Sequence, residues 1–228
     1  MNYEYKYLTM VLHSDNKLVE LESEIYSALG LDDSSSRGIS GNPRVLSLLS
    51  SILERSIQKN EKASRKQEVV TIFHGSRAPS MSLREYIERI FKYSTCSPSC
   101  LVLAYVYINR YLQRIDASLT ILVAHRLLIT SIMVAAKYTD DDCYNNAYFA
   151  KVGGVSTAEL NRLEMKFLFT LDFKLHVTTE AFRKYCLHLE TEAAGERRIE
   201  QLNQTNRLEK GRPNKGKSFS TSYSFRAK

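Results

Sequence analysis

The sequence contains little glycine and little proline, with nine and four of them among 228 residues. Both residues mark tight turns, so their scarcity favours long helices over many short strands. Apolar residues make up 43% of the chain and charged residues 25%, which are the proportions of a soluble globular protein. We therefore expect one well-buried helical domain, with about a hundred residues left over for arms.

Familiar catalytic motifs are also missing. The strings G-x-G-x-x-G, H-E-x-x-H and G-x-S-x-G do not occur. The four cysteines include no C-x-x-C pair and have no histidine at metal-ligand spacing, which predicts reduced thiols in an intracellular protein. Asp140, Asp141 and Asp142 are consecutive, whereas a cation-binding loop alternates its ligands. We expect no enzymatic activity, no metal, no cofactor and no small-molecule substrate.

The longest apolar run, Thr120 to Tyr138, contains His125, Arg126 and Lys137. Ionisable residues at this density argue against a membrane span and for a buried helix. The N-terminus carries early acidic residues and has no small-residue cleavage site, so a secretory signal is not expected. We expect no membrane contact.

The net charge of +7 is unevenly distributed along the chain. Residues 1–40 hold three basic and seven acidic side chains (−4), and residues 191–228 hold nine basic and four acidic ones (+5). After Glu190 apolar residues give way to Asn, Gln, Lys, Gly and Ser, which predicts a disordered tail. A basic tail can contact nucleic acid or acidic partners, but a solubilising arm is the simpler interpretation.

Composition divides the chain into four parts. Residues 1–42, which include a Ser-rich break, are expected to be a loosely ordered arm. Residues 43–79 begin with helical spacing of apolar residues over Pro43–Gln58 and continue as a linker. Residues 80–190 are the predicted helical domain, and residues 191–228 are the basic tail.

Capping residues mark the helix starts within the predicted domain. The candidate N-caps are Ser82, Ser97, Ser156 and Thr178. Two of them are followed three residues later by glutamate, the spacing of a capping box: Ser82 with Glu85 and Ser156 with Glu159. Ser97 is followed by Pro98, and proline is favoured at the first helical position because its missing N–H costs nothing there.

Apolar residues at helical spacing predict five helices in the domain. They are expected directly after Ser82 and over Pro98–Arg114, Thr120–Tyr138, Ala147–Val152 and Ser156–Leu171. The third is apolar on nearly every side, so other helices must surround it. The predicted fold is all-α: a five-helix bundle around a central buried third helix, with an extra N-terminal helix.

Two charged residues lie where the apolar pattern leads us to expect hydrophobic ones. Lys137 ends the third helix, and Glu164 lies inside the apolar stripe of the fifth. Burying either charge without a partner would cost several kcal/mol. They can pair with each other or reach solvent, or they can form a polar island in an apolar docking surface that awaits a partner's backbone.

Three strings resemble the cyclin box in order and spacing: YVYINRYLQR, SIMVAAKYTDD and LNRLEMKFLFTLDFKL. The resemblance covers residues 80–190. The flanking NPRVLSLLSSILERSIQKN and SLREYIERIFKYSTCSPSCLVLAYVYINRY look most like plant U-type (P-type) cyclins, which are similar to fungal phosphate-signalling cyclins. The cyclin box is a five-helix bundle around its third helix, in agreement with the pattern above.

The resemblance implies a regulatory subunit that binds and activates a cyclin-dependent serine/threonine protein kinase as a heterodimer. Its role would lie in cell division or in nutrient (phosphate) signalling, in the nucleus or the cytoplasm. In cyclins a lysine ending the third helix and a glutamate in the fifth hydrogen-bond the kinase, and the matching residues are Lys137 and Glu164. The matching apolar contact positions are Val134, Tyr138, Leu168 and Phe173.

Some features depart from the family pattern. Many cyclins have Asp-Arg-Phe in the second helix, whose aspartate bonds an arginine of the first; here Asn109 replaces the aspartate, and Arg84 and Arg89 are the candidate partners. A second hypothesis is a cyclin-box adaptor in transcription that contacts nucleic acid through its basic tail, but neither a second box nor a zinc ribbon is visible. A helical enzyme is a third and remote one.

Overall fold

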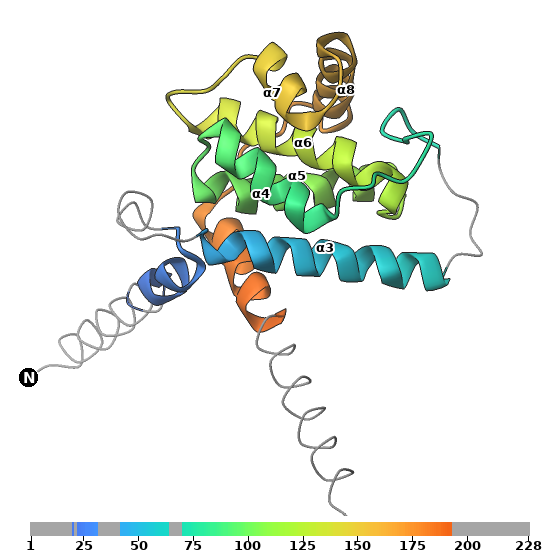
Figure 1. Cartoon of the computed structure of the whole chain (residues 1–228). Coiled ribbons are helices and arrows are strands. Elements are labelled where there is room, and N and C mark those ends of the chain that lie inside the picture. Colours follow the sequence, from blue (N-terminus) through green and yellow to red (C-terminus); the bar gives the residue numbers. More distant parts are fainter. Residues whose placement is uncertain (1–19, 21, 32–41, 64–69, 193–228) are drawn as a thin grey trace, which may run out of the picture. The chain divides into compact units, whose positions relative to one another are not determined.

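The computed structural model describes residues 20, 22–31, 42–63 and 70–192, and this part of the chain is helical without strands (Figure 1). Its labelled helices are α3 (Arg44–Ala63), α4 (Leu83–Ser94), α5 (Pro98–Arg114), α6 (Ile121–Thr139), α7 (Asn146–Gly153) and α8 (Thr157–Thr170). Further helical residues lie at 22–29 and 179–192. The all-α prediction is confirmed, and α4 to α8 are the five helices expected from the sequence.

Helix α6 is the centre of the bundle. It packs against α5, α4, α7 and α8, and Figure 1 shows α7 and α8 on the opposite side of it from α3. Ile129, Ile132 and Met133 are completely buried. Among the described residues α6 is the one helix long and apolar enough to cross a membrane, but 72% of its apolar window is buried inside the domain. Burial of this kind is typical of a core helix.

The predicted capping box at the start of α4 is confirmed. The Ser82 Oγ accepts from the Glu85 backbone N–H at 3.2 Å, and the Ser82 N–H donates to Glu85 Oε2 at 3.0 Å. The Ser82 hydroxyl and the Ser82 N–H both donate to the Glu85 carboxylate, and they hold the pKa of this carboxyl below its usual value. Ser97 and Pro98 likewise begin α5, and the Ser97 hydroxyl donates to Asp140 Oδ1 at 2.9 Å. The start of α5 is thereby tied to the end of α6.

The second predicted capping box is half right. The Ser156 Oγ accepts from the Glu159 N–H at 3.1 Å, as expected. The Glu159 carboxylate does not return to Ser156; it pairs with Arg126 Nε at 2.6 Å. An arginine on the neighbouring helix offers a stronger, charge-assisted bond than a backbone amide. Glu159 therefore ties α8 to α6 rather than completing the cap.

Helix α3 is longer than expected and packs against α4 and α5. It continues to Ala63, whereas the sequence analysis ended it at Gln58. Charged residues such as Lys59 and Glu61 do not end a helix when its outer side faces water. Its inner stripe is buried: Val45, Leu46, Leu49, Ile52, Leu53 and Ile57. The Asn60 side chain donates to the Leu119 carbonyl at 2.9 Å.

Part of the arm predicted for residues 1–42 is packed. Leu29 is completely buried, and the Tyr26 ring lies 6.0 Å from that of Phe182. Arg183 donates to Glu22 at 3.1 Å. Residues 22–31 thus contact the last helical segment, residues 179–192. The remainder of the arm and residues 193–228 lie outside the described residues. The predicted disorder of the basic tail therefore stays a prediction.

The segment between α3 and α4 is more than a linker, because it inserts a side chain into the core. Phe73 is completely buried, with its ring 5.1 Å from that of Tyr111 and 6.3 Å from that of Phe167. The Gly75 N–H donates to the Leu122 carbonyl at 2.8 Å. Residues 70–82 are therefore anchored to α5, α6 and α8.

Gly153 and Gly154 form the turn after α7. A β-carbon on Gly153 would lie 2.7 Å from Ile129 Cγ1, so only glycine fits against α6. Gly154 has φ 70°, the left-handed conformation that commonly ends helices. Packing against α6 and the turn between two helices account for this pair of glycines.

Candidate functional site

The two charged residues singled out in the sequence lie together. The Lys137 Nζ is 2.7 Å from Glu164 Oε1, and the side chains are 35% and 15% exposed. Lys137 stands in the last turn of α6, where the negative end of the helix dipole favours a cation. The free chain therefore satisfies these charges through each other, at the protein surface.

Asn146, the first residue of α7, joins both charges and was not found from the sequence. Its Oδ1 accepts a hydrogen bond from Lys137 Nζ. Its Nδ2 donates to Glu164 Oε2 at 2.6 Å and to Asn161 Oδ1 at 2.7 Å. An asparagine in a polar loop carries no pattern that would mark it. It fixes the pair from a third helix.

Large apolar side chains remain exposed at the end of α6 and after α8, the two helices that carry this pair. Tyr138 is 49% exposed and Phe173 is 56% exposed, and both line the same groove. Leu168, one turn after Glu164 on α8, is half-buried. Val134, the remaining predicted contact position, is 2% exposed in the free chain. It is one turn before Lys137, at the inner edge of that helical face, where neighbouring helices cover it.

Two further exposed apolar residues were missed. Met165 is 50% exposed and Phe169 is 63% exposed. The Phe169 ring meets that of Phe173 edge to face at 5.3 Å. Their spacing of four residues on α8 could have shown them as a second stripe beside Leu160, Leu163 and Phe167. We call the following set the α6–α8 face: Lys137, Tyr138, Glu164, Met165, Phe169 and Phe173.

The backbone after α8 adopts an uncommon conformation that places Phe173. Asp172 and Phe173 have φ of 55° and 54°, in the left-handed region that bulky residues avoid. Such strain persists only where the surroundings enforce it, and it is frequent at binding sites. The Phe173 N–H donates to the Leu168 carbonyl at 3.0 Å.

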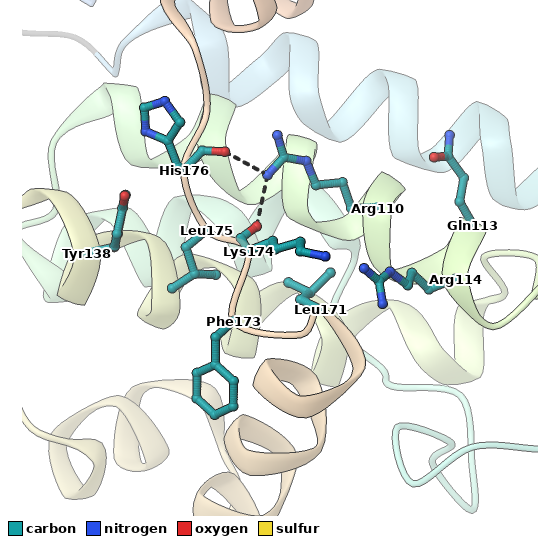
Figure 2. Close-up of a pocket in the computed structure, with 9 residues that line it drawn as sticks. All are labelled: Arg110, Gln113, Arg114, Tyr138, Leu171, Phe173, Lys174, Leu175 and His176. Carbon is teal, nitrogen blue, oxygen red and sulfur yellow. Dashed lines mark hydrogen bonds between the residues drawn. The ribbon is translucent and has the colours of Figure 1, made fainter.

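Residues 174–176, which follow Phe173, are held against α5 through their carbonyl groups. Arg110 Nη1 donates to the carbonyls of Lys174 and His176, each at 3.1 Å (Figure 2). The Tyr107 hydroxyl donates to the Leu175 carbonyl at 2.8 Å, and burial raises the pKa of this hydroxyl well above its usual value. The hydroxyl therefore stays protonated and can donate. Residues 173–176 are in place before any partner binds.

The predicted cross-brace from Asn109 to the first box helix is not made by either candidate arginine. Arg84 pairs with Glu88 on its own helix at 3.1 Å. Arg89 donates to the Val152 carbonyl at 2.9 Å. The Asn109 amide instead contacts the Tyr105 hydroxyl, whose pKa is raised because burial outweighs this hydrogen bond. The neutral amide of Asn109 attracts a guanidinium group less strongly than the carboxylate of an aspartate would.

A metal-binding cluster is not found in the described part of the chain. No group of three or more His, Cys, Asp or Glu side chains there could hold a metal ion. Asp140, one of the consecutive aspartates, accepts from the Ser97 N–H at 3.0 Å. His125 is buried and contacts the Met81 carbonyl at 3.0 Å, so it is a core residue.

One string in the tail, GRPNKGKS at residues 211–218, has the spacing of a phosphate-binding loop. Such a loop works between a strand and a helix, which direct its amides at the phosphates. The string lies outside the described residues, and the part of the chain that is described is helical without strands. The spacing alone does not make a nucleotide site.

Comparison with known proteins places this geometry in a family. The sequence profile of the cyclin family matches residues 43–175. Cyclin-P3-1 of Oryza sativa subsp. japonica is 54% identical over 173 residues, which are 74% of this chain and 73% of the relative. Cyclin-U3-1 of Arabidopsis thaliana is 49% identical over 173 residues, covering 75% and 78%. Cyclin-U2-1 of Arabidopsis thaliana is 44% identical over 179 residues, covering 77% and 78%.

The family match begins at residue 43, so it takes in α3 together with the five-helix bundle. The helical bundle around α6 agrees with the family match. The chain belongs to the cyclin family, as a regulatory subunit of the plant U/P type.

Proposed function

We propose that this cyclin binds a cyclin-dependent serine/threonine protein kinase through the α6–α8 face and activates it. The observation that carries the proposal is the Lys137–Glu164 pair, held at the surface among exposed aromatic side chains. An apolar surface with a polar centre suits a protein partner, because aromatic anchors supply most of the binding energy and polar groups set the register.

Activation needs no catalytic group in this chain. A kinase transfers phosphate efficiently only when its strand lysine pairs with a glutamate of its movable C-helix. A partner that binds only this arrangement shifts the kinase population toward it by its differential affinity. Reversing a 1:99 population takes a preference of about 10⁴-fold. The kinase itself would supply the ATP and Mg²⁺ sites.

The two charges would contact the main chain of the kinase near that helix. The ammonium of Lys137 offers three N–H donors, and the carboxylate of Glu164 offers only acceptors. Tyr138, Phe169 and Phe173 would pack on apolar side chains around them. The process that the complex regulates would be cell division or nutrient (phosphate) signalling, in the nucleus or the cytoplasm.

The direct test is affinity purification of the full-length tagged chain from a native plant extract, followed by a protein kinase assay of the eluate. Mass spectrometry of the bound fraction identifies the kinase. Recovery of a cyclin-dependent kinase whose activity rises when the purified chain is added supports the proposal. A stable, folded chain that recovers no kinase activity would count against it.

We expect Lys137→Ala and Glu164→Ala each to weaken kinase binding by roughly tenfold, because each removes a hydrogen-bonding charge from the interface. Both variants should keep the circular dichroism spectrum of the parent. The matched control is Arg84→Ala, which breaks the exposed Arg84–Glu88 pair on α4. Kinase binding equal to that of the parent, or simple unfolding of both variants, would contradict the role assigned to this pair.

A further inference from the structure

A groove of about 710 Å³ lies between the C-terminal end of α5 and the segment after α8 (Figure 2). Leu171, Phe173, Leu175 and Tyr138 form its apolar lining. Its polar lining consists of Arg110, Gln113, Arg114, Lys174 and His176. We call it the α5–α8 groove.

The charge of the groove is positive. Of the described residues that line it, three are arginine or lysine and none is acidic. The nearby Asp172 pairs with Lys174 at 2.9 Å, but these side chains are 62% and 70% exposed. An ion pair so open to water contributes little and leaves Lys174 available to another anion. Arg110 uses a single nitrogen, Nη1, for its two backbone bonds.

The groove is also preformed. The bonds from Arg110 and Tyr107 to three consecutive carbonyls fix the wall formed by residues 174–176. A rigid wall lowers the entropic cost of binding, because little has to be ordered when the partner arrives. A positive rim around a fixed apolar floor suits a segment that carries acidic residues on both sides of an apolar one.

The groove is continuous with the α6–α8 face, since Tyr138 and Phe173 belong to both. A partner seated on the face is therefore positioned to extend into the groove. Figure 2 shows Tyr138 on one side of the groove and Arg114 on the other. The chain's own tail, with a charge of +5 over residues 191–228, would be repelled by the rim.

We infer that the α5–α8 groove binds an acidic segment of the same kinase and selects kinases by its charge. This inference rests on the proposed function, because it assigns the occupant of the groove to the partner of the α6–α8 face. Attraction across a rim of charges acts mainly on the rate of association and weakens as salt rises.

The test is the charge-reversed double variant Arg114→Glu/Lys174→Glu in the full-length chain. The probe is the kinase identified in the purification above, produced as a recombinant protein. Arg110 is kept, because it holds the wall of the groove. We expect binding to weaken by about tenfold at low ionic strength, through slower association, and the difference to shrink at high salt. The control Lys59→Glu/Lys62→Glu, on exposed positions of α3, changes the net charge equally and should bind like the parent.

The outcomes separate the two proposals. If Lys137→Ala weakens binding but the double variant binds like the parent, the inference about the groove is overturned and the proposed function stands. If neither change affects binding, both fall. Tighter binding by the double variant would also overturn the inference, and would instead fit the acidic residues 1–40 of this chain as the occupant.

Discussion

At the scale of single residues, Asn146 decides how firmly the charge pair is held. It accepts from Lys137 and donates to Glu164, so it fixes the position of both while they also bond each other. A binding group that is already in place loses less entropy on complex formation. Asn146 is therefore a positioning residue for the α6–α8 face.

We predict that Asn146→Ala weakens kinase binding several-fold and lowers the free energy of unfolding by about 1 kcal/mol, the typical contribution of such hydrogen bonds. The direct Lys137–Glu164 pair remains but becomes mobile. Calorimetric titration with the kinase and urea denaturation measure the two effects. The control is Asn161→Ala, which removes one contact to Asn146 and leaves its bonds to the charges. Equal effects of the two variants would refute the positioning role.

Some residues of the candidate site can be predicted from the sequence and others cannot, for physical reasons. Lys137 and Glu164 are visible because a charge inside an apolar stripe requires an explanation. Asn146 is not, because a polar side chain in a polar loop contradicts no pattern. Val134 matches a contact position by resemblance and is 2% exposed in the free chain, so its contact with a partner stays a prediction. Whether the pair bonds itself or a partner also depends on side-chain geometry, and in the free chain it bonds itself.

At the scale of elements, helices are easier to predict from the sequence than the segments that connect them. Local capping and spacing predict α4 to α8 because these interactions lie within a few residues of each other. The segment 70–82 has neither regular spacing nor caps, so its role depends on long-range packing. Phe73 packs edge to face against Tyr111 and Phe167, whose rings stack on each other at 5.3 Å, so it covers the direct contact between α5 and α8.

We predict that Phe73→Ala lowers the free energy of unfolding by about 3–5 kcal/mol, because it leaves a cavity beside the stacked rings of Tyr111 and Phe167. Chemical denaturation monitored by circular dichroism measures the change. The neighbouring Val70→Ala is the control: Val70 is 81% exposed, and its replacement should change stability by about 0.5 kcal/mol or less. Equal stability of the two variants would show that residues 70–82 do not anchor the fold.

At the scale of the whole molecule, the packed helices extend beyond the predicted domain of residues 80–190. Helix α3 buries its stripe of Val45, Leu49 and Leu53 against α4 and α5. Composition separates it from the bundle because the charged stretch after residue 58 resembles a linker. The family match from residue 43 and the packed contacts of residues 22–31 agree that the structure begins earlier.

We predict that a fragment of residues 80–192 aggregates or unfolds without cooperativity, because it exposes the apolar sides of α4 and α5. A fragment of residues 20–192 should remain monomeric and unfold in one transition. Size-exclusion chromatography and thermal unfolding distinguish the two. Equal melting temperatures for monomeric samples of both would show that α3 is dispensable.

The pairing of Lys137 with Glu164 has a consequence for partner choice. Since each group already has a bond in the isolated chain, a protein that docks on this face gains only the difference between the old bonds and the new ones. A partner whose main chain cannot match them removes water from the pair and offers no hydrogen bonds in return, which costs free energy although the two charges stay bonded to each other. The pair would then contribute more to the specificity of binding than to its affinity.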